Sequence, residues 1–411
     1  MIEPSQASSP RQIGPPKYER VPLRVLLVGP FTGYDPPSGD LAYTEALLVD
    51  PPVGVRYTTL HEALDVGAVR VRGRKPWHGV SRTADLALFA ARAVELGARG
   101  LGIMFREQTL YLTVEEERFD LVHQHLFPVR LLGAQLPTVS SAGYPLTELY
   151  QAREGWGLRR LNLALGLEDG LARLAGTHQP WLRPSRTGVL TVYTPCFRDW
   201  LVARGVPGAR IHVVGTALPD LPTPPRSSDG RTLGVVARDF HLKGGSLAVA
   251  VLRRLRSKDP SWRCVVATTR GIVGTDLAGE PGVEVHWDPP RSEVLNGVLP
   301  RVDVLLALTR SDCGAPYSVL EALHAGAGVV VSDSAWLDPR LSGPAVARVP
   351  RDPVAAAAAV TELLGGGPAV LSAAAVALWR TTFSMPVLQA ELLRAYRQAI
   401  DLAGEAARSD C

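Results

Sequence analysis

Short apolar runs alternate with segments of helical periodicity along the first half of the chain. The apolar, β-branched runs predict buried strands at residues 23–30, 120–125, 138–141, 188–193 and 211–214. The patterns between them predict helices at residues 41–48, 83–96 and 197–204. Strands that alternate with helices in this way indicate a doubly wound α/β domain with a parallel sheet.

The alternation starts again after residues 218–230, which contain four prolines and two adjacent serines and have the composition of an exposed linker. Further strands are predicted at 233–237, 264–268, 283–287, 302–308 and 328–332, with helices at 246–257 and 319–325. The pattern thus predicts two similar α/β domains. The predicted parts are a disordered lead-in at 1–22, an N-terminal domain at 23–217, the linker, a C-terminal domain at 231–383, and a closing helix and tail at 384–411.

The composition is that of an ordinary soluble protein. With 46% hydrophobic and 20% charged residues, a chain of 411 residues can form two to three domains with ample cores. The net charge of +4 is small and dispersed, and it does not indicate a nucleic-acid partner. The preference for arginine over lysine, with abundant alanine, glycine and proline, is typical of a high-GC bacterial genome.

Cysteine usage and hydropathy predict a cytoplasmic location. The four cysteines show neither metal-binding nor disulfide spacing, which favours a reducing compartment. Residues 1–20 are polar and proline-rich, unlike a signal peptide. No uninterrupted apolar run approaches the ~20 residues of a membrane span. The alanine-rich residues 354–379 are broken by a glutamate and three consecutive glycines, so they predict two short helices.

Two short clusters have the chemistry of a phosphate site. Residues 236–245 follow a predicted strand, and residues 312–322 form a glycine-bearing turn that opens a predicted helix. A diphosphate needs fixed cations, here Arg238 and Lys243, and unpaired backbone N–H groups, here near Ser318. The chain has only four lysines against forty arginines, and a compact ammonium before Gly-Gly suits a close approach to phosphate. The alternative is a solvated basic loop.

These clusters and three further segments resemble the retaining glycosyltransferases of the GT-B fold that form family 4. The resemblance covers residues 23–341. It is carried, in chain order, by Ser-Gly-Asp at 38–40, Asp-Leu-Val-His-Gln-His at 120–125, residues 205–214, Arg238 with Lys243-Gly244, and Gly314 with Leu320-Glu321-Ala322. Each motif alone is weak, whereas five in the family's order and spacing are a strong indication. The resemblance implies two Rossmann-like, doubly wound domains that face each other across a cleft, with the acceptor side N-terminal and the nucleotide-sugar donor side C-terminal.

The resemblance also implies roles for the matching residues of the donor side. Arg238 and Lys243 would bind the donor diphosphate and stabilise the leaving group as negative charge develops. Glu321 would accept hydrogen bonds from both ribose hydroxyls, and the amides of Ser318 and Val319 would hold phosphate. The alternative for Glu321 is a carboxylate that compensates a helix dipole.

On the acceptor side, the resemblance implies that Gly39 lets the backbone approach the same phosphate. His125 would reach the transferred sugar and, with Arg238 and Lys243, would be catalytic. His123 is placed on the other face of the strand, so His125 is preferred. A core or capping histidine is the alternative reading of His125.

The chain departs from the family pattern in the loop before the predicted helix. The family usually has a glutamate eight residues before Glu321, where it contacts hydroxyls of the transferred sugar. This chain has Cys313 at that position, and a thiol is a weak hydrogen-bond acceptor. Asp312 takes over this contact if the loop is shifted by one residue. The expected donor-binding set therefore includes Asp312, Cys313 and Gly314. Two other departures are Ala315-Pro316 in place of Phe-Gly and Gly215-Thr216 in place of Asn-Gly.

The expected reaction is transfer of a sugar from a nucleoside diphosphate sugar, with UDP or GDP as the carrier, to an unidentified hydroxyl acceptor. Neither half offers a carboxylate pair at recognisable spacing, so retention by front-face attack is expected. No Asp-x-Asp metal motif occurs, and Arg238 with Lys243 would replace a cation. We therefore expect metal-independent transfer without a cofactor.

Two other functions stay open. A non-catalytic nucleotide-sugar binding protein or partner subunit is motivated by Cys313, and a GT-B sugar-nucleotide epimerase or phosphorylase shares the expected fold. Residues 151–167 mix Arg153, Arg159 and Arg160 with Trp156 and leucines. They predict an amphipathic surface helix, with weak contact to an anionic membrane or acidic acceptor as the alternative. The sequence leaves the oligomeric state open.

Overall fold

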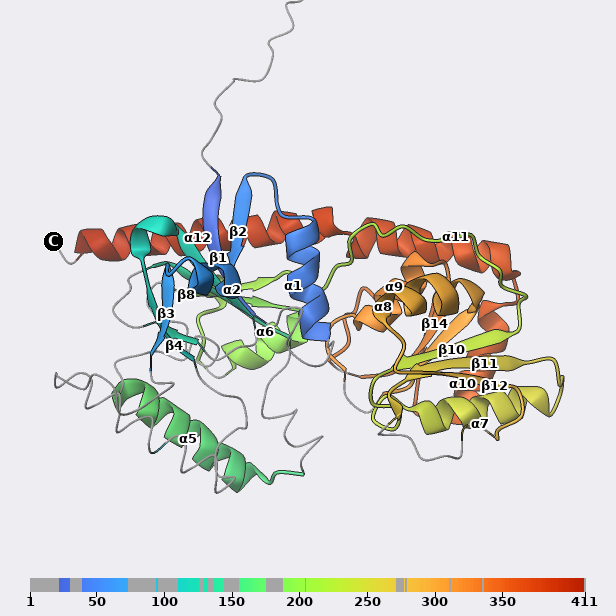
Figure 1. Ribbon diagram of the computed structural model, residues 1–411. Coiled ribbons are helices and arrows are strands. Elements are labelled where there is room, and N and C mark those ends of the chain that lie inside the picture. The colour runs from blue at the N-terminus through green and yellow to red at the C-terminus, as the bar shows by residue number, and fades with distance from the viewer. Residues whose placement is uncertain are drawn as a thin grey trace, which may run out of the picture.

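The structure, a computed structural model, describes most of the chain. The described residues are 22–29, 39–72, 94, 110–125, 129–131, 136–143, 155–174, 188–203, 205–270, 277, 279–309, 312–334 and 336–409. Apart from Pro22 and Val94, the predicted lead-in at 1–22 and the predicted helix at 83–96 lie outside them. Two six-stranded parallel sheets form the centres of two domains that lie next to each other (Figure 1). The predicted α/β class is confirmed.

The N-terminal sheet has the strand order β2-β1-β5-β7-β8-β9. Its strands are β1 (Leu23–Val28), β2 (Val55–Thr59), β5 (Leu121–His125), β7 (Thr138–Ala142), β8 (Gly188–Val192) and β9 (Ile211–Val213). All neighbours in it are parallel. Helices α1 (Gly39–Val49) and α6 (Pro195–Val202) follow β1 and β8. Five of the six strands are those that the apolar runs predict, and β2 is the one missed.

A small second layer in this domain was not predicted. It consists of β3 (Val69–Arg72), β4 (Leu110–Val114) and β6 (Val129–Leu131), next to helix α2 (Leu60–Asp65). Helix α2 begins with a capping box, in which Thr59 accepts from the amide of Glu62 and the Glu62 carboxylate accepts from the amide of Thr59. This layer buries its own apolar cluster against β1 and β5.

The C-terminal sheet has the strand order β12-β11-β10-β13-β14-β15. Its strands are β10 (Thr232–Ala237), β11 (Arg263–Thr268), β12 (Val283–Trp287), β13 (Val304–Ala307), β14 (Gly328–Ser332) and β15 (Val346–Val349). Helices α7 (Gly245–Arg256) and α10 (Pro353–Leu363) cover one face, and α9 (Tyr317–His324) and α11 (Pro368–Leu378) cover the other (Figure 1). The two short helices expected in the alanine-rich segment are confirmed as α10 and α11.

Among the described helices, none is by itself long and apolar enough to cross a membrane. Helix α10 and the segment Pro368–Phe383 reach that length and hydropathy only as a pair, which is bent by 99° at the break between them. Both members of the pair pack against other elements of the C-terminal domain.

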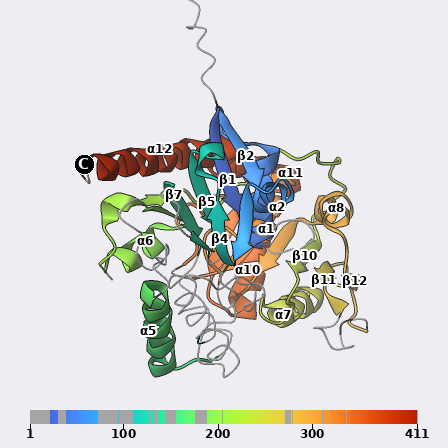
Figure 2. The same cartoon turned by 60° about the vertical axis from the view of Figure 1, so that its left-hand side comes forward.

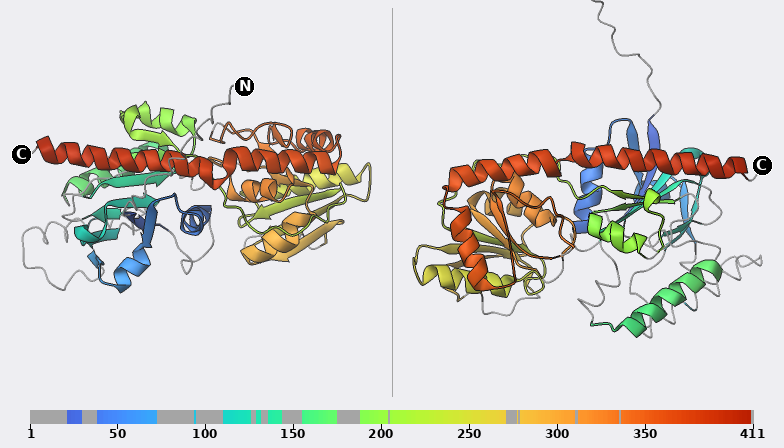
Figure 3. Two further views of the ribbon diagram at one scale, coloured as in Figure 1. Left: turned by 90° about the horizontal axis from the view of Figure 1, so that it is seen from above. Right: turned by 180° about the vertical axis from the view of Figure 1, so that it is seen from behind.

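The long final helix α12 (Met385–Ser409) returns to the N-terminal domain (Figure 3). It packs against β5, β7, β8 and β9. The hydroxyl of the buried Tyr396 lies 2.6 Å from Nδ1 of His123 and 2.8 Å from the hydroxyl of Tyr57. The chain therefore passes between the domains twice, and the two passes run side by side where Leu218 pairs with Ser384.

We expect Tyr396→Phe to lower the free energy of unfolding by about 2 kcal/mol, because it leaves the polar groups of His123 and Tyr57 without partners in the interior. Tyr57→Phe is the matched control. It leaves the bond between Tyr396 and His123 intact, so a loss of about 1 kcal/mol is expected. Urea unfolding followed by circular dichroism measures both values. Equal losses in the two variants would show that the bond to His123 contributes nothing.

Helix α5 (Leu158–Leu174) lies at the outer edge of the N-terminal domain (Figure 2). Leu161 is buried, whereas Arg159 and Arg160 are exposed. The Arg160 guanidinium lies 3.9 Å from the ring centroid of Trp156, which is itself buried. The helix has one buried and one charged face, as predicted, but it begins at Leu158 and runs to Leu174, so residues 155–157 of the predicted range are not helical. Residues 151–154 of that prediction lie outside the described part of the chain.

Candidate functional site

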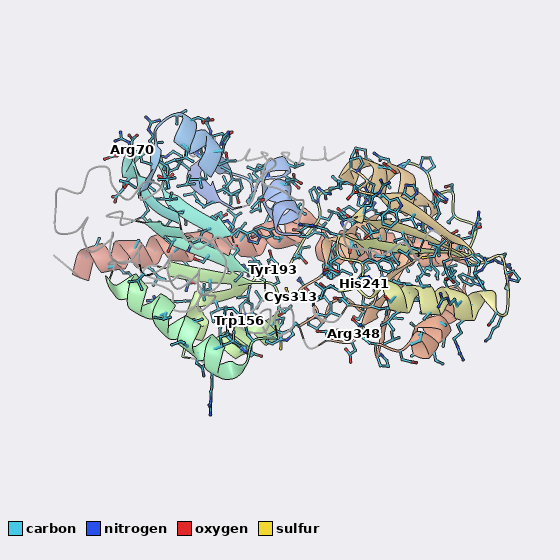
Figure 4. The ribbon with its side chains drawn as sticks, turned by 60° about the horizontal axis from the view of Figure 1, so that its bottom comes forward. Arg70, Trp156, Tyr193, His241, Cys313 and Arg348 are labelled. Carbon is cyan, nitrogen blue, oxygen red and sulfur yellow. The ribbon has the colours of Figure 1, made fainter. Side chains whose placement is uncertain are left out.

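The carboxyl ends of the two parallel sheets face each other. Tyr193 directly follows β8, and Gly314 lies between β13 and α9. A Cβ built on Gly314 would lie 3.0 Å from Cβ of Tyr193, and one built on Gly143 would lie 3.3 Å from Sγ of Cys313. Tyr193 and Cys313 lie next to each other where the two halves meet (Figure 4). Because ligands of open α/β sheets bind outside the carboxyl ends of the strands, the junction between the domains is the candidate site.

The turn after β10 brings a lysine to this edge. Gly244 has a φ of +80°, and a Cβ on it would lie 2.1 Å from the carbonyl oxygen of Leu308. A Cβ on Gly245 would lie 2.2 Å from the ring of Phe240. Both glycines are therefore required by close packing at the start of α7. They hold Lys243 over the end of β13.

Lys243 forms an ion pair with Asp312. The structure thus joins two residues predicted separately, a phosphate-binding cation and a candidate acceptor for a sugar hydroxyl. Arg238, which follows β10, is exposed and makes no hydrogen bond or ion pair with the described residues. At this sheet edge, Lys243 is therefore neutralised by Asp312, whereas Arg238 has no counter-charge among the described residues.

Helix α9 begins at Tyr317, close to the predicted start. The amide of Val319 donates to the carbonyl of Pro316 at 2.9 Å. The amide of Ser318 donates to no acceptor among the described residues. Of the two amides predicted to hold phosphate, the Ser318 amide is the available one.

The loop before α9 is fastened to the first pass between the domains. The Thr216 hydroxyl donates to the carbonyl of Ala315 at 2.8 Å and accepts from the amide of Ala315 at 3.1 Å. Gly215 before it has a φ of +74°. The Gly215-Thr216 pair, which departs from the family pattern, therefore fixes the loop that precedes Ser318.

Glu321 is buried, with 6% of its surface exposed, and it is held by an arginine that the sequence did not suggest. Arg291 donates from Nε to Oε1 of Glu321 at 2.8 Å, and its Nη2 lies 2.8 Å from the same oxygen in an ion pair. Nη1 of Arg291 lies 3.2 Å from Oε2 of Glu45 on α1 of the other domain. Burial raises the pKa of Glu321, and the nearby Arg291 opposes the rise. Glu321 lies beyond the first turn of α9, so it is not a carboxylate placed to compensate the helix dipole.

His125 at the end of β5 is fully buried. Its ring stacks on that of Tyr43 with the centroids 4.2 Å apart, and its Nε2 lies 3.4 Å from the Tyr193 hydroxyl. Burial and the neighbouring His123 hold its pKa well below the usual value, so the ring is neutral. Its Nδ1 has no partner among the described residues. The burial agrees with a core histidine, whereas the orphaned Nδ1 indicates a missing partner.

The prediction that His123 lies on the opposite face from His125 is wrong. Residues two apart on a strand share a face, and both rings contact Tyr43. His123 is used structurally, since its ring nitrogens bond Tyr396 and Ser141. Burial lowers its pKa to about 3.

Gly39 opens α1, whose following turn and a half carry Tyr43 and Glu45 to the same junction. A cavity of about 300 Å³ adjoins this helix and is lined by Glu45, Arg291 and apolar side chains. Within the described ranges, no three His, Cys, Asp or Glu side chains gather as a metal ion requires.

No protein-family model matches the sequence, and no curated protein is significantly similar to it. Solved structures are similar. A glycosyltransferase from Rickettsia africae ESF-5 is 11% identical, with a TM-score of 0.55 over 92% of this chain and 99% of that one. Sucrose-phosphate synthase from Thermosynechococcus elongatus is 15% identical, with a TM-score of 0.52 over 92% and 98%. At these identities the likeness concerns the fold, and the chain therefore has the two Rossmann-like domains of the GT-B fold.

Proposed function

We propose that the protein is a retaining glycosyltransferase, which moves a sugar from a nucleoside diphosphate sugar to a hydroxyl acceptor without a metal ion. The observation that carries the proposal is the set of groups at one sheet edge. Arg238, Lys243 and the amide of Ser318 are the donors that a diphosphate needs, and the buried carboxylate of Glu321 suits ribose hydroxyls. The fold shared with a glycosyltransferase supports this reading.

In the proposed reaction the bond between the anomeric carbon and the diphosphate oxygen breaks. The acceptor oxygen bonds to the same face of the sugar, and its proton passes to the leaving phosphate. Arg238, Lys243 and the Ser318 amide stabilise the negative charge on that phosphate. This electrostatic stabilisation is strongest where water is excluded. As Lys243 turns to the phosphate, Asp312 is released to accept a hydrogen bond from the sugar. Nδ1 of His125 has no partner among the described residues. It can hydrogen-bond the transferred sugar once the rings of Tyr43 and Tyr193 move aside.

A non-catalytic nucleotide-sugar binding protein is the second candidate, and the environment of Cys313 favours it. This residue replaces the family's glutamate, and its sulfur lies against Gly143 of the other domain. Tight donor binding without turnover, with turnover restored by Cys313→Glu, would support this alternative.

A thermal-shift screen with UDP-, GDP-, ADP- and TDP-sugars tests the proposal. We expect one nucleotide class to raise the melting temperature, because a ligand that binds only the folded state stabilises it. We also expect slow hydrolysis of that donor without acceptor, unchanged after exhaustive chelation. If none of these donors shifts the melting temperature, the proposed function is wrong. If activity disappears on chelation and returns with a divalent ion, metal independence is wrong.

A further inference from the structure

Arg291 connects the two domains through carboxylates from each. Its guanidinium donates to Glu321 on α9 and lies 3.2 Å from Glu45 on α1. It sits on the short helix α8 (Arg291–Glu293) that follows β12. We infer that Arg291 is a positioning residue of the donor site, which holds one oxygen of Glu321 and thereby aims the other at the nucleotide ribose. This inference rests on the proposed function.

The hydrogen-bond geometry separates the two oxygens of Glu321. Nε of Arg291 donates to Oε1 at 2.8 Å, and Nη2 lies 2.8 Å from the same Oε1 as an ion-pair contact. Oε2 accepts from no group in the described part of the chain. A carboxylate with one oxygen held by a charged hydrogen bond and a second ion-pair contact cannot rotate freely, so the second oxygen has a defined direction. Ribose hydroxyls, which donate, are the groups that the proposed donor offers to it.

The position of Arg291 is itself braced from both sides. Glu45 takes the remaining nitrogen, Nη1, from the N-terminal domain. On α8, Oε1 of Glu293 lies 2.7 Å from Nδ1 of His286 on β12, which ties this three-residue helix to the sheet edge. A lysine in place of Arg291 has no planar fork and cannot make the same set of contacts.

Charge explains why the guanidinium matters for binding. The charged groups of the described residues that face Glu321 are Arg291 and Glu45. Without the guanidinium, the buried carboxylate keeps its desolvation and the repulsion from Glu45 but loses its counter-charge. Its pKa then rises further, and the protonated form is a poorer acceptor for ribose hydroxyls.

Titration calorimetry of wild type and Arg291→Gln tests the inference, with UDP, GDP, their 2′,3′-dideoxy forms and inorganic pyrophosphate as probes. We expect Arg291→Gln to lower the affinity for the nucleotide that wild type binds by about tenfold or more. Pyrophosphate affinity stays unchanged, because Arg238, Lys243 and Ser318 are intact. Wild type binds the dideoxy nucleotide more weakly than the parent nucleotide, whereas Arg291→Gln binds the two with similar affinity. The variant also loses nucleotide affinity as the pH falls from about 8 to about 6, and wild type changes less.

Arg253→Gln is the matched control, since it removes an arginine paired with Glu280 away from the site and leaves all affinities unchanged. Equal ribose discrimination in Arg291→Gln and wild type, or tighter nucleotide binding by the variant, overturns the inference and leaves the proposed function standing. If wild type binds none of UDP, GDP, ADP and TDP, the proposed function is overturned instead. If Arg291→Gln does not fold, Arg291→Lys decides, with partial loss of discrimination expected and full retention contradicting the inference.

Discussion

Lys243→Ala is expected to lower kcat/KM for the donor by about 10²–10³-fold, the usual effect of removing one group that stabilises charge developing in the transition state. Lys243 is the ammonium at the carboxyl edge, held there by the turn through Gly244 and Gly245. The variant should also abolish the thermal shift produced by the donor, as should Arg238→Ala. Initial rates of donor hydrolysis and melting curves measure the two effects.

Lys258→Ala is the control for this prediction. Lys258 is an exposed lysine just beyond the other end of the same helix, α7, so the substitution makes the same chemical change away from the edge. Its kinetics should match wild type. Because Lys243→Ala leaves Asp312 without its counter-charge, the melting temperature without ligand must be measured as well. A folded Lys243→Ala protein with wild-type kcat/KM would remove this lysine from the mechanism.

Gly244→Ala is expected to lower the free energy of unfolding by about 3 kcal/mol, from the sum of two costs. A left-handed backbone costs a non-glycine residue about 1–2 kcal/mol. The new methyl would also lie 2.1 Å from the backbone oxygen of Leu308, which cannot move as a side chain can. Urea unfolding measures the loss.

Gly54→Ala separates the two costs. Gly54 has the same φ of +80°, but a Cβ there meets no atom within 4 Å. We therefore expect only the backbone cost of about 1 kcal/mol in this control. Equal losses at both positions would mean that the contact with Leu308 relaxes freely, and that the lysine turn is not pressed against β13.

Most of the strands that the sequence predicts lie inside the sheets, although the edge strands β9 and β12 are predicted as well. Strands β1, β5, β8, β11 and β14 are central or nearly so, and their near-continuous apolar runs leave a clear signal. The missed strands β2 and β15 lie at sheet edges, where one side faces solvent and polar residues interrupt the run, as Arg348 does in β15. The small sheet of β3, β4 and β6 was missed because its strands are short and pair across long stretches of sequence.

The residues of the candidate site also differ in how well the sequence predicts them. Local patterns identify Lys243 with its two glycines and the start of α9, because turn and helix-start chemistry is written in consecutive residues. The partners of those residues are not local. Arg291 meets Glu45 across 246 positions of sequence, and Lys243 meets Asp312 across 69. Only the Pro-Pro-Arg sequence at the end of a predicted strand could have drawn attention to Arg291.

The return of α12 to the first domain restricts how the halves can move. Two chain segments, rather than one, connect them, and these segments are bonded to each other from the Leu218 amide to the Phe383 carbonyl at 2.8 Å. A paired connection of this kind resists twisting more than bending. We therefore expect the junction to open and close about a single axis. We also expect the domains to stay together after cleavage of the backbone at residues 218–230, because α12 still packs against β5, β7, β8 and β9.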